Sequence, residues 1–270
     1  MTEINPIAHI SCDLKSKFGV PRQSGIVEEL KGKIVFEKEY SDPEAFRGIE
    51  EYTYIWVIWQ FSKNVGKEHS PTVRPPILGG NKRVGVFATR SSFRPNDLAL
   101  SCVRLDSIIR SPEGNMILEV SGIDMADGTP VFDIKPYIPK WDVKENADGG
   151  FTERHEKRLL KIKYDCEMKK MFKEEQFKAL VKLLEQDPRP AYKNDPDKIY
   201  GFDYADFEIK FKVNGDELEI ISISDERCHK TNKANRCGWS YHKKEEVRFI
   251  KPIMKKSNWF FQWFHNNDKM

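Results

Sequence analysis

The sequence predicts a mainly β fold, in which short strands forming a barrel or a sandwich are followed by a small α+β unit. Residues 1–137 contain strand-length apolar runs separated by Gly, Pro, Asn and Asp clusters. Residues 153–184 change to a composition rich in Glu, Lys, Leu and Met, which is typical of helices. Residues 207–223 then alternate apolar and polar side chains around Asn-Gly. No long helices alternate with the strands of the first half, so we do not expect a doubly wound sheet.

The first half is expected to hold at least five strands. The run Tyr52–Phe61 is aromatic and β-branched and too short for most helices, which predicts a largely buried strand. Four further segments have strand length and composition: Arg83–Thr89, Leu98–Leu105, Met116–Ser121 and Val131–Lys135. Gly79-Gly80 is interpreted as a turn that needs positive φ.

The second half begins with a helical segment and continues with a hairpin. Helical spacing within Glu153–Leu184 predicts a helix that ends before Pro188. Asn214-Gly215 lies between two alternating runs, which is the strongest short hairpin signal. We therefore divide the chain into a β domain over residues 1–150, a small α+β domain over 151–226 and a tail over 227–270.

Composition restricts the class of protein. No run approaches the roughly 18 apolar residues that span a bilayer, so we expect no membrane insertion. The amino-terminal residues lack the basic-then-apolar order of a secretory signal, which predicts a cytoplasmic protein. Five cysteines are an odd number at scattered spacings, which argues against a disulfide framework.

The tail carries the excess of positive charge. Residues 227–270 contain 11 Lys and Arg against 3 Asp and Glu, a net charge of +8, whereas the whole chain has +3. Three interpretations compete: a basic segment that binds the phosphates of a nucleic acid, an apolar packing segment around Trp259–Phe264, and a zinc site. The adjacent Cys228-His229 pair does not match the spacing of common zinc modules, so we expect no metal.

Three segments outside the tail combine charge with stiff loops. Neither GxGxxG after a strand nor a Walker-type loop is present, so the two common backbone cradles for nucleotides are missing. Lys17–Gln23 presents an arginine and an amide beside a proline, and Arg74–Asn96 places four arginines among prolines. Gly122–Tyr137 contains a tight Asp127-Gly128 turn, followed by Asp133, Lys135 and Tyr137 on one face of a strand. Each segment alone is compatible with turns and surface charge, but together they favour a binding site.

The same segments carry a resemblance to a known family. KFGVPRQ, RPPILGGNKRVGVFATRSSFRPN and SGIDMADGTPVFDIKPYIP look like the signature of the TsaA-like tRNA threonylcarbamoyladenosine N6-methyltransferases. QDPRPAY and the hairpin after Tyr200 are similar to the small carboxyl-terminal domain of that family. The resemblance covers about residues 4–224. It implies a single-sheet β-barrel methyltransferase domain, a homodimer, a tRNA substrate and S-adenosylmethionine bound by loops.

The resemblance also implies which residues hold the methyl donor. They lie in four of the loops: Pro21, Arg22, Gln23, Ser62, Lys63, Arg90, Leu100, Asp127, Gly128, Thr129 and Pro130.

The implied reaction is attack by the N6 nitrogen of the modified adenosine on the sulfonium methyl group, with geometry supplying most of the rate. That nitrogen is a poor nucleophile, so an acceptor is needed for its proton. Asp133 is the first candidate, because Asp127 is expected to contact the donor. Arg94 or Lys135 is expected to pair with the threonyl carboxylate of the substrate.

Two other classes of function remain open. A non-catalytic tRNA-binding module is favoured by Tyr54 and Ser62, which stand where the family usually has histidine. A hydrolase built on Asp127 and Asp133 is the other alternative, but no Ser/His or metal-ligand constellation in the β domain supports it.

Overall fold

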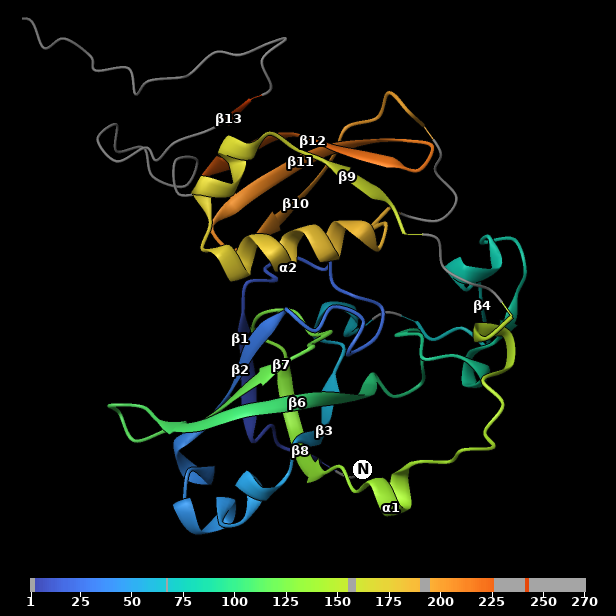
Figure 1. The fold of residues 1–270 in the computed structure, drawn as a ribbon. Helices are drawn as coiled ribbons and strands as arrows, with labels where there is room; N and C mark the ends of the chain where they lie inside the picture. The colour runs from blue at the N-terminus through green and yellow to red at the C-terminus, as the bar shows by residue number, and fades with distance from the viewer. Residues whose placement is uncertain (1–2, 67, 155–158, 190–194, 226–240, 243–270) are drawn as a thin grey trace, which may run out of the picture.

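A computed structural model of the chain shows a closed β-barrel with a smaller α+β unit packed on one end (Figure 1). The structure describes residues 3–66, 68–154, 159–189, 195–225 and 241–242. The predicted mainly β fold is confirmed, and a barrel is observed rather than a sandwich. The described residues contain no helix with the length and apolar character that crossing a membrane requires.

The barrel is a single antiparallel sheet in the order β1-β2-β7-β6-β3-β8, closed where β1 pairs with β8. Along β3, Ile55, Val57 and Trp59 point inward and are buried, because successive side chains of a strand face opposite sides. The six strands have the following bounds: β1 Ala8–Cys12, β2 Lys31–Phe36, β3 Tyr54–Gln60, β6 Leu98–Arg110, β7 Met116–Ser121 and β8 Pro130–Pro136.

Four of the five predicted strands are confirmed, as β3, β6, β7 and β8. However, β3 is buried on one face only, and β6 continues beyond the predicted Leu105 to Arg110. The strand predicted over Arg83–Thr89 is wrong. Only β5 (Val84–Gly85) is extended there, because its one partner is the equally short β4 (Thr72–Val73). A longer strand would leave backbone groups without a ladder partner.

The second unit contains a sheet in the order β10-β11-β12-β13, with β9 parallel to β12, and one long helix. The helix predicted within Glu153–Leu184 begins only at Glu174, because residues 161–163 pair with β12 instead. It ends before Pro188, as predicted, and the Asn214-Gly215 hairpin is confirmed. The elements are β9 Lys161–Lys163, α2 Glu174–Glu185, β10 Tyr200–Tyr204, β11 Phe207–Asn214, β12 Glu217–Asp225 and β13 Tyr241–His242.

Short helical segments occupy many of the connections. Among the connections that the structure describes, the one α-helical segment is α1 (Pro139–Asp142), after which the chain runs up to the β4–β5 excursion (Figure 1). The remaining segments are 3-10 turns: Lys38–Tyr40, Pro43–Phe46, Ile49–Glu51, Ser62–Asn64, Pro76–Leu78, Val86–Ala88, Gly150–Thr152 and Cys166–Met171. Apart from β13, the tail over 227–270, with its proposed zinc, apolar and phosphate-binding roles, lies outside the described residues.

The two units are joined by backbone contacts and a shared core. The loop after β1 bonds to the β10–β11 turn, where Ala205 N donates to Asp13 O at 2.8 Å. The helix side chain Gln176 donates to the Asp13 carboxylate at 2.8 Å. Gly19 packs so closely on Phe202 that a Cβ atom there would lie 2.6 Å from the ring. The apolar residues of both units form one continuous cluster, so the junction between them is a fixed part of the molecule.

Candidate functional site

A large cavity lies where the loops at one end of the barrel meet the second unit. Its volume is about 1560 Å³, above the range of about 300–1000 Å³ usual for one small ligand. Its wall is built from seven loop segments, which lie within residues 17–26, 59–64, 73–77, 87–93, 126–129, 149–152 and 187–189. The cavity is therefore shared between the barrel and the second unit.

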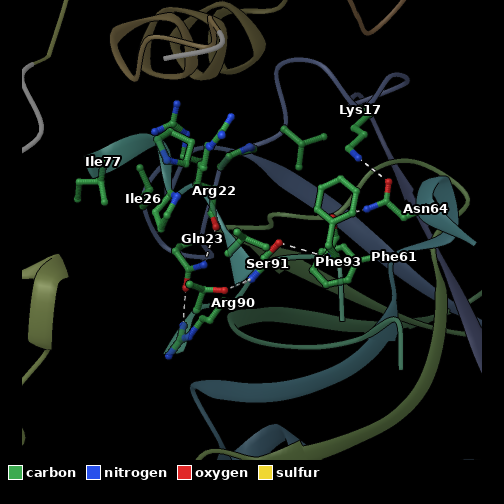
Figure 2. Close-up of a pocket in the computed structure, with 18 of the residues that line it drawn as sticks. Lys17, Arg22, Gln23, Ile26, Phe61, Asn64, Ile77, Arg90, Ser91 and Phe93 are labelled. Atoms are coloured by element: carbon green, nitrogen blue, oxygen red, sulfur yellow. Dashed lines mark hydrogen bonds between the residues drawn. The ribbon is translucent and has the colours of Figure 1, made fainter. Parts of the chain in front are cut away.

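One side of the cavity is formed by Arg22, Gln23 and Arg90 (Figure 2). The Arg90 guanidinium donates to the Gln23 amide oxygen, and the Gln23 amide nitrogen donates to the Arg22 carbonyl at 2.6 Å. Pro21 is buried and stiffens this turn. Desolvation in the concave wall lowers the pKa of Arg22, and the Asp187 carboxylate partly opposes that effect. This side therefore presents two guanidinium groups on two loops that the Arg90–Gln23 hydrogen bond joins.

The other side of the cavity is formed by Lys17, Asn64 and Phe93 (Figure 2). The Lys17 ammonium donates to the Asn64 amide oxygen at 2.5 Å and lies 6.0 Å from the centre of the Phe93 ring. Asn64 is only 2% exposed, and its amide nitrogen donates to the Ser92 hydroxyl. These bonds fix the lysine at the wall.

Two aromatic residues of the cavity wall, Trp59 and Phe61, form what we call the aromatic floor, and a chain of buried polar side chains supports it. The rings of Trp59 and Phe61 meet edge to face at 4.6 Å. Trp59 Nε1 donates to Ser101 Oγ at 2.9 Å, which in turn donates to Asp124 Oδ1 at 2.6 Å. Burial raises the pKa of Asp124 from 3.8 to about 6, against the opposing effects of the Ser101 hydrogen bond, of backbone hydrogen bonds and of the Arg90 charge. Sequence reasoning missed Asp124, although an acid within the apolar run IDMA was a usable signal.

The cavity wall carries a strong excess of positive charge. Among its described residues, six are cationic and Asp187 is the single carboxylate. The cations are Lys17, Arg22, Lys63, Arg74, Arg90 and Arg189. A wall of this kind favours anionic or multiply hydrogen-bonding ligands. The described residues contain no cluster of His, Cys, Asp and Glu suited to a metal.

Seven of the eleven residues expected to hold the methyl donor lie together in this wall. They come from four loops: Pro21, Arg22, Gln23, Ser62, Lys63, Arg90 and Thr129. Their convergence supports one binding region for residues that are far apart in sequence.

The remaining four expected donor residues lie outside the cavity wall. Asp127 accepts from Cys12 N at 2.9 Å and pairs with Lys15 at 3.0 Å, and Gly128 N donates to Ile10 O at 2.8 Å. The tight Asp127-Gly128 turn is therefore present but bonded to β1, and Pro130 begins β8 beside it. Leu100 is on the outer face of β6, 52% exposed.

None of the three residues predicted to be catalytic lines the cavity. Arg94 holds its own loop, since its Nη1 donates to Thr89 O at 2.6 Å and to Val86 O at 3.3 Å. Asp133 and Lys135 share a face of β8, as predicted, but pair with each other on the barrel exterior at 2.8 Å.

Comparisons with known proteins identify relatives over most of the chain. The family model for the tRNA-methyltransferase O N-terminal domain matches residues 9–143, and the model for the TrmO C-terminal domain matches 157–226. A tRNA (adenine(37)-N6)-methyltransferase from Escherichia coli is 34% identical over 82% of this chain and 97% of its own length.

A putative S-adenosylmethionine-dependent methyltransferase from Pseudomonas aeruginosa is 32% identical over the same shares of the two chains. The crystal structure of TrmO from P. aeruginosa superposes with a TM-score of 0.66 at 27% identity, covering 83% of this chain and 97% of that one. Both family models, the relatives matched over nearly their full length and the barrel fold indicate the same family. The chain belongs to the tRNA-methyltransferase O family.

Proposed function

We propose that the protein transfers a methyl group from S-adenosylmethionine to N6 of adenosine 37 in tRNA, where that adenosine carries a threonylcarbamoyl group. The observation that carries the proposal is the basic, aromatic-floored cavity, in which residues of four barrel loops converge. The name of the E. coli relative gives the position and the atom, and the names of other relatives give the methyl donor. The threonylcarbamoyl group follows from the resemblance of the sequence motifs.

The cavity fits the donor in size and in chemistry. The aromatic floor of Trp59 and Phe61 suits a sulfonium cation and an adenine ring, since ring faces attract cations and stack on bases. The Arg90 guanidinium can donate paired hydrogen bonds to the carboxylate of the donor, and the Gln23 amide can bond to its hydroxyl groups. When bound, S-adenosylmethionine supplies an electrophilic methyl carbon, whose bonding pair returns to sulfur as N6 gains the methyl group and loses its proton.

The contribution of the chain is mainly orientation. The buried Asn64 fixes Lys17, and Ser101 fixes Trp59, so one side and the aromatic floor of the cavity are held before any ligand arrives. Pre-set walls remove much of the entropic cost of aligning nitrogen, carbon and sulfur. The proton acceptor role predicted for Asp133 remains part of the proposal, and in one protomer that side chain lies on the barrel exterior.

We also propose that the protein is a homodimer that pairs through the outer face of β3, β6 and β8. Apolar side chains are exposed there, among them Tyr54, Leu98 and Leu100. The Asp133–Lys135 pair is on the same face, opposite Ile58 and Trp56 of β3. A partner at this face would bring these residues near a second barrel. Leu100→Glu is expected to shift sedimentation to the monomer, and an unchanged dimer would refute this interface.

The function is tested with labelled donor and two tRNA pools, one with the threonylcarbamoyl group and one without it. Label is expected only in the modified pool. Equal labelling of both pools would contradict the substrate assignment, and tRNA binding with no donor binding by calorimetry would instead favour the non-catalytic module. The cytoplasm is the compartment we propose, in keeping with the absence of disulfides among the described cysteines.

A further inference from the structure

The cavity is larger than the predicted donor site and continues toward the second unit. The seven donor residues within it belong to the barrel loops. Other parts of the wall come from residues 73–77 and 87 and from residues 149–152 and 187–189. None of the predicted donor residues belongs to this second part of the cavity, which therefore offers space for a second ligand.

The corner Asp187–Arg189 is costly for folding. Asp187 has a φ of +50°, a left-handed conformation that side chains other than Gly adopt at a cost. Its carboxylate pairs in bidentate fashion with Arg189, at 2.8 and 2.9 Å, and the arginine side chain is only 10% exposed. Enclosed ion pairs are weak contributors to stability because both charges lose hydration. Strain and an enclosed pair on the wall of a cavity together favour a binding role.

The chemistry of this corner favours an oxyanion. The pair with Asp187 uses two of the five N–H groups of Arg189 and leaves three for other acceptors. The Asp187 carboxylate also acts on Arg22, where it raises the pKa against the larger effect of desolvation, and both arginines line the cavity. Arg74 adds a further exposed cation to the same cavity. The excess positive charge is balanced when a carboxylate or a phosphate enters.

Apolar side chains also line this part of the chain's cavity wall. Phe151 is half-buried and lines the cavity from the segment between the two units. Ile77 lines it from the 3-10 turn at residues 76–78 (Figure 2). Enzymes that modify a base take it out of its stack and hold it against such side chains.

We propose that the second unit and the segment that leads into it supply the acceptor subsite, with Phe151 against the base and Arg189, held by Asp187, binding an oxyanion of the acceptor nucleotide. The oxyanion is either a carboxylate on the base or a backbone phosphate. The proposal rests on the proposed function for the identity of the acceptor. It assigns a substrate-binding role to the second unit, whereas the donor residues all belong to the barrel.

The test measures the affinity of two anticodon stem–loop RNAs by fluorescence anisotropy at one fixed salt concentration. One RNA carries the threonylcarbamoyl group on the adenosine and the other does not. Arg189→Gln is compared with wild type and with Arg110→Gln. Arg110 is an exposed arginine at the far end of the 13-residue β6, roughly 40 Å from the cavity end of that strand. Donor affinity is measured for each protein by calorimetry.

Arg189→Gln is expected to raise the Kd of the substituted RNA about tenfold, because a charge-assisted bond is lost, while donor affinity stays unchanged. A loss confined to the substituted RNA identifies the carboxylate, and an equal loss for both RNAs identifies a phosphate. A folded Arg189→Gln protein that binds both RNAs like wild type would overturn the proposal. If that variant fails to fold, Arg74→Gln replaces it and is judged by the same criteria. Wild-type protein that binds RNA without methyl transfer would refute the proposed function alone.

Discussion

At the scale of single residues, the chemistry of the site depends on polar groups that are enclosed and partnered. Asp124 is the clearest case, because its carboxyl group is desolvated and its pKa is raised to about 6. The unfolded chain ionises at the ordinary value, so ionisation of the folded protein above about pH 4 costs stability. The contribution of protonated Asp124 to the free energy of unfolding is fully present below that pH and is lost as the pH rises through about 6.

Asp124→Asn is therefore expected to flatten the pH dependence of unfolding. Relative to the variant, wild type should lose roughly 2–3 kcal/mol between about pH 4 and pH 7, which corresponds to the shift of about two pKa units. Urea unfolding at several pH values measures the difference. Glu50→Gln, an exposed carboxyl-to-amide change, is the control. Parallel profiles for wild type and Asp124→Asn would contradict the raised pKa.

At the scale of elements, the loop over residues 86–94 depends on one arginine. Arg94 donates to the carbonyls of Val86 and Thr89, and its guanidinium lies 5.7 Å from the centre of the Phe87 ring. The residue predicted to read a substrate carboxylate therefore organises the loop that carries Arg90. Its effect on binding is expected to be indirect.

Arg94→Lys and Arg94→Gln are expected to lower stability alike, by about 1–2 kcal/mol, and to weaken donor binding alike. Lysine keeps the charge but cannot reproduce the planar fork. Thermal unfolding and donor calorimetry measure both effects. If lysine instead preserves activity on the modified tRNA, the charge itself matters and the original prediction of a carboxylate-binding role is restored.

The elements also show how much of the fold and of the site can be predicted from the sequence alone. Composition and turn residues predicted β3, β6, β7, β8 and the Asn214-Gly215 hairpin, because these are local signals. The short β5 was overestimated, since its length depends on a partner elsewhere in the chain. Burial of Asp124 and the effect of Asp187 on Arg22 depend on the docking of loops, which no local pattern encodes. Motif resemblance supplied the donor residues, but it did not indicate which of them share one wall.

At the scale of the whole molecule, the two units behave as one body because their cores are continuous. Gly19→Ala tests this joint, since a Cβ atom would lie 2.6 Å from the Phe202 ring of the second unit. The substitution also strains a φ of +92°. We expect a loss of about 1–3 kcal/mol from overpacking beyond the backbone cost.

The matched control is Gly48→Ala, which has a φ of +88° but no atom within 4 Å of its Cβ position. The difference between the two variants in the free energy of chemical unfolding measures the contribution of packing between the two units. Equal losses of unfolding free energy would show that Phe202 moves aside freely and that the packing between the two units is easily deformed.

The closure of the barrel has a consequence for synthesis of the chain on the ribosome. One edge of β1 finds β2 early, but its other edge must wait until residues 130–131 have been made. Such distant pairing folds slowly and leaves a strand edge open meanwhile. Ala126 and Thr129 of the cavity wall lie next to this seam. A nascent chain therefore has no complete cavity wall until its first and last barrel strands have met, and binding of a ligand in this cavity would report completed folding.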